Sequence, residues 1–310
     1  MSGARRAART AQVRALAKIN LDLRVLAKRP DGYHELRTIF QTISLADTLD
    51  ISFTPARQTT INLEDPLGIP GNLAERAARL AMETLRVSGR VEIRLAKKIP
   101  LGAGLGGGSS DAAAVLLALP VLAGRRPDVA ALCAMGQQLG SDVPFFLLGG
   151  RAVGIGRGSE LFPLPDRPAR PGLLVTPDVH VSTADAYQRL SERLGTPAEK
   201  IFRFQSQAWA LDAAMPGEND FEPVVFEQHP DLAAVKERLL RAGASAAMMT
   251  GSGSALFGLF DDRQAVTRAM PQFAAERRFR FSLVSRARYR SMWWGALASH
   301  ISGRTWPPGL

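Results

Sequence analysis

A stretch of small residues between positions 100 and 111 is the part of the sequence that most directly predicts a chemical role. It reads Pro100-Leu101-Gly102-Ala103-Gly104-Leu105-Gly106-Gly107-Gly108-Ser109-Ser110-Asp111, with five glycines in seven residues. Glycine tolerates positive φ angles and lacks the Cβ atom that would keep a large anion away, so consecutive backbone N–H groups can face one concavity. A helix that starts at the serines would add its free amides and the positive end of its dipole. The sequence therefore predicts a phosphate-binding loop, whose Ser109 and Ser110 hydroxyls reach phosphate oxygens or a bound Mg²⁺.

The two most familiar phosphate-binding patterns do not fit this loop. It lacks the Gly-Lys-Ser/Thr ending of a Walker A loop, and no opening βαβ unit surrounds its Gly102-Ala103-Gly104 start as a dinucleotide fingerprint requires. A flexible hinge is the alternative, but hinges more often mix glycine with serine and charged residues and do not adjoin a helix. The composition favours a phosphate site.

The segments around the loop alternate between strand and helix patterns, which predicts a mixed α and β fold. Residues 91–95 alternate strictly between apolar and charged side chains, so we expect a half-buried strand before the loop. An alanine-rich helix over about 109–119 follows it, and Asn72 and Asp128 fit the N-caps of two further helices. Four prolines between 163 and 171 mark a domain boundary.

The second half restarts with a strand near 173–175, and Ser182 begins the next helix. A second glycine-rich loop, Gly251-Ser252-Gly253-Ser254, precedes an apolar strand over 255–260. From these patterns we expect a disordered basic tail over 1–14, a first domain over 15–165 that carries the phosphate loop, a second domain over 166–290 and a C-terminal extension over 291–310.

The formal net charge of +10 is concentrated at the two ends of the chain. Residues 1–14 contain four arginines and no acid, and residues 275–310 contain seven arginines and one acid, so the part between them is formally neutral. A basic nucleic-acid-binding protein that uses its termini is therefore one alternative, although the neutral body favours no specific nucleic-acid partner.

Other classes of protein are excluded more directly. A hydrophobic content of 46% excludes disorder throughout, and the single cysteine, Cys133, excludes an internal disulfide and a Cys-rich zinc module. No cluster of histidines and carboxylates has the spacing of a metal site. The longest apolar run, over 112–123, is too short to cross a bilayer. We expect a cytoplasmic protein without a membrane partner.

Three motifs together resemble the kinase superfamily named for galactokinase, homoserine kinase, mevalonate kinase and phosphomevalonate kinase. The loop over 100–110 resembles its ATP-phosphate motif, Ala17-Lys18-Ile19-Asn20-Leu21 resembles its first motif, and Met249-Thr250-Gly251-Ser252-Gly253-Ser254 resembles its third. Within the superfamily, residues 28–41, 139–146 and 219–222 are similar to the kinases that act on 4-diphosphocytidyl-2-C-methyl-D-erythritol. The resemblance covers residues 15–290. It implies an α+β fold with an N-terminal domain like the second domain of ribosomal protein S5, a ferredoxin-like C-terminal domain, and a cleft between them for substrate and ATP.

Phosphoryl transfer to an alcohol requires cradled phosphates, neutralisation of the transferring group and a base for the hydroxyl proton. Lys18 and Asp142 are the candidates for the last two tasks, and the resemblance implies the same pair. Asp142 would accept the proton, and Lys18 would keep Asp142 ionised and offset charge near the γ-phosphate. Without the resemblance, Lys18 would be read as a strand-end lysine and Asp142 as a turn residue before Pro144.

Aromatic residues predict how the substrate is held. Tyr33 offers a stacking face for a pyrimidine, and His34 can donate or accept a hydrogen bond at the edge of the base. The resemblance implies that His34 binds cytosine, that Tyr33 stacks on it, and that Tyr187 closes the other side of the base. Tyr187 packed into the core is the alternative. Asn20 is expected to hydrogen-bond the substrate near its reacting end.

The resemblance thus implies a kinase that uses ATP, with accompanying Mg²⁺, to phosphorylate the 2-hydroxyl of 4-diphosphocytidyl-2-C-methyl-D-erythritol for isoprenoid synthesis by the non-mevalonate route. The partner is then a small molecule with a cytidine diphosphate group, and the enzyme is a monomer or a homodimer. A kinase of the same superfamily with another small alcohol as its acceptor, such as isopentenyl phosphate or a mevalonate derivative, is the alternative.

Overall fold

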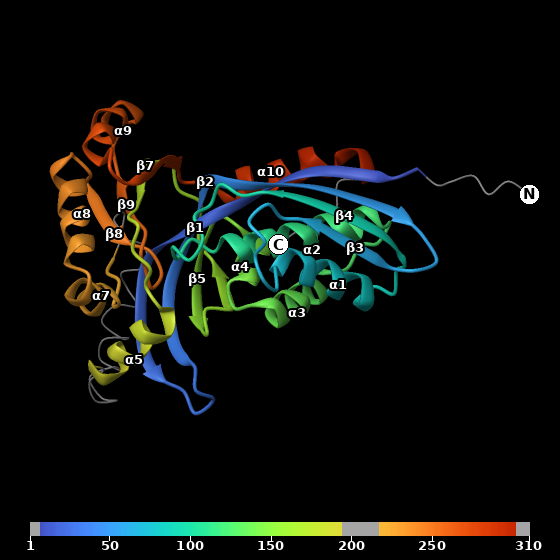
Figure 1. Cartoon of the computed structure of the whole chain (residues 1–310), viewed down its shortest axis with the longest axis horizontal. Helices are drawn as coiled ribbons and strands as arrows, with labels where there is room; N and C mark the ends of the chain where they lie inside the picture. Colours follow the sequence, from blue (N-terminus) through green and yellow to red (C-terminus); the bar gives the residue numbers. More distant parts are fainter. Residues whose placement is uncertain (1–6, 194–216, 302–310) are drawn as a thin grey trace, which may run out of the picture.

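Two β-sheets, each packed against its own helices, build the molecule, which is described here from a computed structural model. The described residues are 7–193 and 217–301. In Figure 1 the first sheet and its helices lie on the right, and the second sheet with α7, α8 and α9 lies on the left. The proline-rich segment between Pro163 and Pro171 connects the two.

The first sheet is organised around one long hairpin of two antiparallel strands, β1 and β2. β1 lies along one edge of β2, and the other edge is shared by β5, which pairs with residues 36–41, and β4, which pairs with residues 48–55. β3 pairs in parallel with β4, and β6 pairs with β5. The elements of this part are β1 (Arg9–Lys28), β2 (His34–Pro55), β3 (Thr60–Glu64), α1 (Leu73–Thr84), β4 (Gly89–Ala96), α2 (Gly107–Leu122), α3 (Val129–Leu139), α4 (Val143–Leu148), β5 (Arg151–Gly156) and β6 (Glu160–Pro163).

Helix α2 lies at the centre of the first core. It contacts α1, α3, α4, β1 and β2, and its residues from Ser110 to Leu122 are all buried. A helix that is apolar on every side needs such a position, because it has no face to offer to water. The helix that follows the glycine loop is therefore fixed on all sides, and its N-terminus is held in place.

The second sheet is fully antiparallel, with the strand order β10-β7-β9-β8. α7 and α8 pack together, and α8 contacts β8 and β9. The elements are β7 (Pro171–Thr176), α5 (Thr183–Arg193), α7 (Glu222–Gln228), α8 (Pro230–Arg241), β8 (Ala246–Met249), β9 (Leu256–Leu259), α9 (Arg263–Ala269), the 3₁₀ turn η2 (Met270–Phe273), β10 (Arg277–Ser282), α10 (Arg286–Leu297) and the 3₁₀ turn η3 (Ala298–His300). The two-domain α+β organisation implied by the resemblance is confirmed.

A third apolar cluster joins the two sheets. Ile19 and Ile43 of the first sheet pack there with Leu174 and Phe257 of the second, and Leu105 of the glycine loop packs among them. An apolar contact of this kind holds the two parts in a fixed relation, because separating them would expose the cluster to water. The glycine loop is thereby fixed between the two sheets.

Near both ends, the described residues differ from the sequence expectation; residues 1–6 of the expected tail and 302–310 of the expected extension lie outside them. Residues 9–14 are the start of β1 rather than a disordered tail, because Ala11, Val13 and Ala15 alternate into the first core. α10 crosses residue 290, the expected end of the second domain, and returns to the first core. There Tyr289 and Trp293 are buried, and the Tyr289 hydroxyl donates to the carbonyl of Phe146 at 2.5 Å.

Candidate active site

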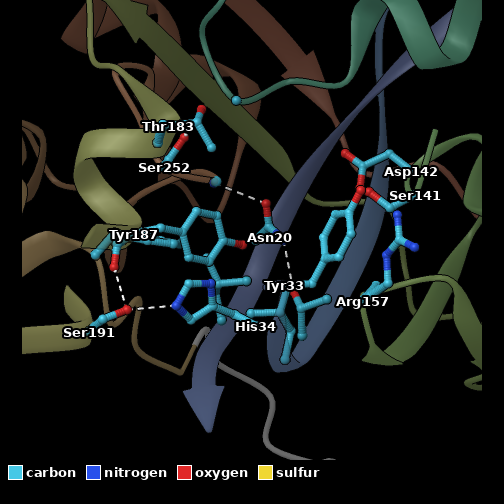
Figure 2. Close-up of a pocket in the computed structure, with 18 of the residues that line it drawn as sticks. Asn20, Tyr33, His34, Ser141, Asp142, Arg157, Thr183, Tyr187, Ser191 and Ser252 are labelled. Carbon is cyan, nitrogen blue, oxygen red and sulfur yellow. Dashed lines mark hydrogen bonds between the residues drawn. The ribbon is translucent and has the colours of Figure 1, made fainter. Parts of the chain in front are cut away.

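A cleft of about 1110 Å³ lies where the two sheets meet. Its lining comes from β1 and β2, both glycine loops, the turn before α4, the turn between β5 and β6, and α5. In Figure 2, His34, Tyr187 and Ser191 are on one side of the cleft, Tyr33, Arg157, Ser141 and Asp142 are on the other, and Asn20 lies between them. Residues from both halves of the chain therefore meet in one site.

The first glycine loop has an alternating conformation. Gly102, Gly104 and Gly106 have φ angles of 65°, 74° and 69°, whereas the side chains of Ala103 and Leu105 between them are buried. The apolar side chains anchor the loop in the interior, and Gly104 and Gly106 line the cleft. This alternation leaves backbone rather than side chains at the cleft surface, as a loop that binds phosphate requires.

The second glycine loop packs directly on the first. A Cβ atom at Gly104 would lie 2.2 Å from the carbonyl oxygen of Thr250, and one at Gly251 would lie 3.0 Å from the Cα atom of Gly104. Only glycine permits this approach at a positive φ. Asn219 supports the second loop from behind, since its Nδ2 donates to the carbonyl oxygens of Met249 and Gly251, both at 2.8 Å.

Asn20 connects the first strand to the second glycine loop. Its Oδ1 accepts hydrogen bonds from Lys18 Nζ at 2.7 Å and from the backbone N–H of Gly251 at 3.0 Å. Its Nδ2 donates to Thr38 Oγ1 at 2.7 Å, and its backbone N–H donates to Thr250 Oγ1 at 3.0 Å. The side chain expected to contact the substrate is thus engaged mainly with the protein, and it holds the Lys18 ammonium in place.

Lys18 and Asp142 lie side by side in the cleft. The distance between Lys18 Nζ and Asp142 Oδ2 is 3.9 Å, and the Asp142 side chain is 32% exposed whereas that of Lys18 is 5% exposed. Lys18 and Asn20 are two residues apart in a regularly paired stretch of β1, so their side chains lie on the same face of the strand. Burial lowers the pKa of Lys18, and the negative charge of Asp142 partly offsets this effect. A partly exposed carboxylate beside a buried ammonium is suited to proton transfer next to an anionic group.

Asp142 is placed by the start of helix α4. It occupies the N-cap position of α4, yet its side chain makes no capping hydrogen bond. The carboxylate is therefore free of the role that Asp residues usually have at this position, and it projects into the cleft beside Ser141 (Figure 2).

Tyr33 and Arg157 form a pair at the wall of the cleft. Tyr33 is 52% exposed, and the guanidinium carbon of Arg157 lies 3.6 Å from the centroid of its ring. A planar guanidinium stacked on an aromatic ring loses little freedom when it also binds an anion. Figure 2 shows this pair beside Ser141 and Asp142.

His34 and Tyr187 face one another across the two halves of the chain. Their rings are stacked, with centroids 4.6 Å apart and an angle of 23° between the planes, and Tyr187 also packs edge-on against Phe221. Burial and the charge of Asp142 raise the pKa of Tyr187 to about 12. The expectation that Tyr187 closes the base site stays a prediction; in this structure its ring covers His34.

The structure corrects the expected role of the Ser110 hydroxyl as a phosphate ligand. The Ser110 hydroxyl donates to the carbonyl of Leu16 at 2.7 Å, its backbone N–H donates to the carbonyl of Gly106, and the residue is buried. Ser110 therefore anchors α2 to β1, because its position in the helix turns it inward. That Ser109 binds phosphate stays a prediction; its Oγ is 4.0 Å from where a Cβ of Gly140 would lie, close to the turn that carries Asp142.

A buried charged cluster lies beside the end of the first glycine loop. Lys97 Nζ contacts Asp47 at 2.5 Å and Asp111 at 2.8 Å, and Asp47 also accepts from the backbone N–H groups of Lys98 and Ile99. The cluster ties the end of β4 to the first turn of α2. Burial raises the pKa of Asp111 to about 7, with the charges of Lys97 and Asp47 acting in opposite directions.

Some residues of the cleft were not identified from the sequence. Arg157 lies in a Gly-Arg-Gly turn, and Ser191 is near the end of α5. A pair of glycines around a charged residue was the one available signal for Arg157, whereas a helical serine carries none. Asn219 was noted only as part of a segment that resembles the family.

The described part of the chain adds two further observations. No group of three or more His, Cys, Asp or Glu side chains within residues 7–193 and 217–301 is arranged to hold a metal ion. Among those same residues, none of the helices combines the length and the apolar character needed to span a membrane.

Comparison with known protein families agrees with this geometry. The family described as "GHMP kinases N terminal domain" matches residues 72–150, and "GHMP kinases C terminal" matches residues 198–276. A crystal structure of homoserine kinase from Cytophaga hutchinsonii ATCC 33406 superposes with a TM-score of 0.70 at 20% identity, covering 92% of this chain and 97% of that one, which shows a common fold. The fold and the paired glycine loops are those of a GHMP kinase, a small-molecule phosphotransferase.

Closer relatives define the particular family. A protein of Solibacter usitatus (strain Ellin6076) named 4-diphosphocytidyl-2-C-methyl-D-erythritol kinase is 64% identical over 305 residues, 96% of each chain. One of the same name from Geobacter sp. (strain M21) is 44% identical over 86% of this chain and 95% of its own. A crystal structure of 4-(cytidine 5'-diphospho)-2C-methyl-D-erythritol kinase matches with a TM-score of 0.74 at 40% identity, covering 88% of this chain and 98% of that one. The chain belongs to the family of 4-diphosphocytidyl-2-C-methyl-D-erythritol kinases.

Proposed function

We propose that the protein transfers the γ-phosphoryl group of ATP to the 2-hydroxyl of 4-diphosphocytidyl-2-C-methyl-D-erythritol, in isoprenoid precursor synthesis in the cytoplasm, where ATP is supplied. The relatives that are 64% and 44% identical to it over the aligned residues are named for this acceptor. The observation that carries the proposal is the Lys18–Asp142 pair, 3.9 Å apart, in a cleft bordered by Gly104 and Gly106.

The chain's own groups divide the reaction between them. The free amides at the start of α2 and the backbone around Gly104 and Gly106 bind the phosphates of ATP. Asp142 accepts the proton of the acceptor hydroxyl as the oxygen attacks phosphorus, and the leaving group is ADP. Lys18, held by Asn20 at 2.7 Å, offsets the negative charge of the phosphoryl group.

The acceptor is held by its nucleotide end. Tyr33 supplies an exposed aromatic face for the pyrimidine, and His34 supplies a polar group for its edge. Arg157, stacked on Tyr33, is placed to bind the diphosphate, which must lie between the base and the reacting hydroxyl. Tyr187 completes the base site from α5.

Mg²⁺ that accompanies ATP fits this site through oxygen donors. Mg²⁺ prefers phosphate oxygens, water and one or two protein oxygens, and the Ser109 hydroxyl near Gly140 is a donor of this kind. The ion would neutralise phosphate charge, and the chain contributes the position of the phosphates.

An ADP-release assay on the purified protein tests the proposal. Activity is measured with ATP and 4-diphosphocytidyl-2-C-methyl-D-erythritol, with mevalonate and with homoserine, each over the same concentration range. We expect turnover only with the first acceptor, and we expect CDP to compete with it. Turnover with mevalonate or homoserine instead would identify another member of the superfamily and overturn the proposed acceptor.

A further inference from the structure

The hydrogen bonds around Ser191 define the state of a neighbouring histidine. Ser191 Oγ donates to the carbonyl oxygen of Tyr187 one turn earlier in α5, at 2.8 Å. The same Oγ lies 2.6 Å from Nε2 of His34, at the start of β2. Figure 2 shows both contacts at one side of the cleft.

A hydroxyl group has one proton, and this fact assigns the second contact. The carbonyl of Tyr187 can only accept, so the Ser191 proton must point toward it. The Ser191 oxygen is then the acceptor in its contact with His34, and His34 Nε2 must carry a proton and donate it. The reverse assignment would place two oxygen lone pairs 2.8 Å apart with no proton between them.

The other ring nitrogen is thereby left as an acceptor. Burial and the positive charge of Lys28 lower the pKa of His34, which keeps the imidazole neutral near pH 7. A neutral imidazole with a proton on Nε2 has a lone pair on Nδ1. Within the described residues Nδ1 forms no hydrogen bond, and His34 borders the cleft.

Cytosine and uracil differ in the exocyclic group to which such an acceptor would be hydrogen-bonded. Cytosine carries an exocyclic amino group, which donates, where uracil carries a carbonyl oxygen, which accepts. An imidazole lone pair attracts the first and repels the second.

We propose that Ser191 is a positioning residue for base selection: by accepting the Nε2 proton of His34, it holds the imidazole in the tautomer whose Nδ1 accepts from cytosine and rejects uracil. Stacking on Tyr187 fixes the plane of the ring, and Ser191 fixes its protonation. The inference rests on the proposed cytidine-bearing acceptor and adds how that base is selected.

The test compares CDP and UDP as competitive inhibitors against the acceptor in wild-type protein and in Ser191→Ala, Ser191→Thr and Ser291→Ala. Ser291 is the matched control, since its hydroxyl also donates to a carbonyl of its own helix, Arg288 at 2.8 Å, away from the cleft. We expect wild-type protein to prefer CDP by about tenfold or more, as one hydrogen bond exchanged for a repulsion implies. Ser191→Ala should reduce this preference at least about fivefold with the KM for ATP unchanged, because the ring is then free to adopt either tautomer. Ser191→Thr, which keeps the hydroxyl, and Ser291→Ala should retain it.

A spectroscopic measurement tests the tautomer itself. ¹⁵N-labelled histidine, with His34 assigned by comparison with His34→Gln, should show Nε2 protonated in wild-type protein and a mixture of tautomers in Ser191→Ala. A proton on Nδ1 in wild-type protein, or an unchanged CDP preference in Ser191→Ala, would overturn the inference and leave the proposed reaction intact. Absence of competition by both CDP and UDP would overturn the cytidine-bearing acceptor, and this inference with it.

Discussion

Replacing Asp142 with asparagine removes a proton acceptor and a negative charge and leaves the shape of the side chain nearly unchanged. Asn has nearly the same shape, and Asp142 makes no capping hydrogen bond that its loss could disturb. The side chain is only 32% exposed, and the similar shape of Asn preserves the packing of its buried part. A positioned general base contributes roughly 10²–10⁴-fold to a rate. We therefore expect Asp142→Asn to lower kcat at least about a hundredfold.

The substitution of Asp142 also lowers kcat through its effect on Lys18. Burial lowers the pKa of Lys18, and Asp142 is the carboxylate that raises it again. Without that carboxylate the pKa of Lys18 falls further, and the ammonium that offsets phosphoryl charge is more easily lost. The two residues therefore act together. We expect the double variant Lys18→Met/Asp142→Asn to lower kcat by a much smaller factor than the product of the factors for the two single variants.

The assay is ADP release at saturating acceptor with ATP varied, so that kcat and the KM for ATP are separated. We expect kcat to fall and the KM for ATP to stay within about threefold of wild type, because the phosphates are held by the backbone of the glycine loop. Asp128→Asn is the matched control: Asp128 also precedes a helix, but it caps α3 outside the cleft, and Asn is an equally good cap. A kcat for Asp142→Asn within about fivefold of wild type would refute the reasoning, since a base worth at least about a hundredfold could not then be Asp142.

Three other perturbations test separate parts of the site. Arg157→Gln should raise the KM for the acceptor about tenfold or more with little change in the KM for ATP, and should weaken CDP more than cytidine in competition assays; equal weakening of both would exclude a diphosphate contact. Gly104→Ala should raise the KM for ATP and lower the thermal midpoint more than Gly71→Ala does, because both glycines have positive φ but only at Gly104 would the new Cβ meet the Thr250 carbonyl; equal shifts would contradict the loop contact. Burial raises the pKa of Asp111 to about 7, so the folded chain keeps a proton that the unfolded chain releases above its ordinary value of 3.8. The free energy of unfolding should therefore fall as pH rises from about 4 to 7. Urea unfolding across that range should show this decline in the wild-type protein and not in Asp111→Asn. An identical decline in both proteins would exclude Asp111 as its cause.

The parts of the fold that follow local rules could be predicted from the sequence. The strand over 91–95 and the N-caps Asn72 and Asp128 appear as expected, since alternation and capping depend on near neighbours in the chain. The start of β1 was missed because the arginines at 9 and 14 obscured the alternation of small apolar residues. Arginine is compatible with a strand when its side chain lies on the solvent side.

The candidate site also combines features that could be predicted from the sequence with features that could not. The glycine loop is recognisable from composition alone, but the meeting of Lys18 with Asp142 depends on long-range packing that no local pattern encodes, and the resemblance was needed to pair them. Arg157 and Ser191 were not found, because the glycines on either side of Arg157 indicate a turn rather than a binding site, and a serine in a helix has no distinctive signature. Ser110 was assigned to phosphate because a hydroxyl after a glycine run has two uses, and only the direction of the helix decides between them.

The two glycine loops together explain why both halves of the chain are needed for one site. A Cβ atom at Gly251 would lie 3.0 Å from the Cα of Gly104, so the two loops pack together with no room for a side chain between them. Asn20 binds Lys18 and the amide of Gly251 through the same oxygen, so the ammonium beside Asp142 is positioned partly by the second half of the chain. The phosphate loop, the charge-neutralising lysine and the second glycine loop are consequently one structural unit. The apolar cluster between the sheets stabilises that unit before any ligand binds.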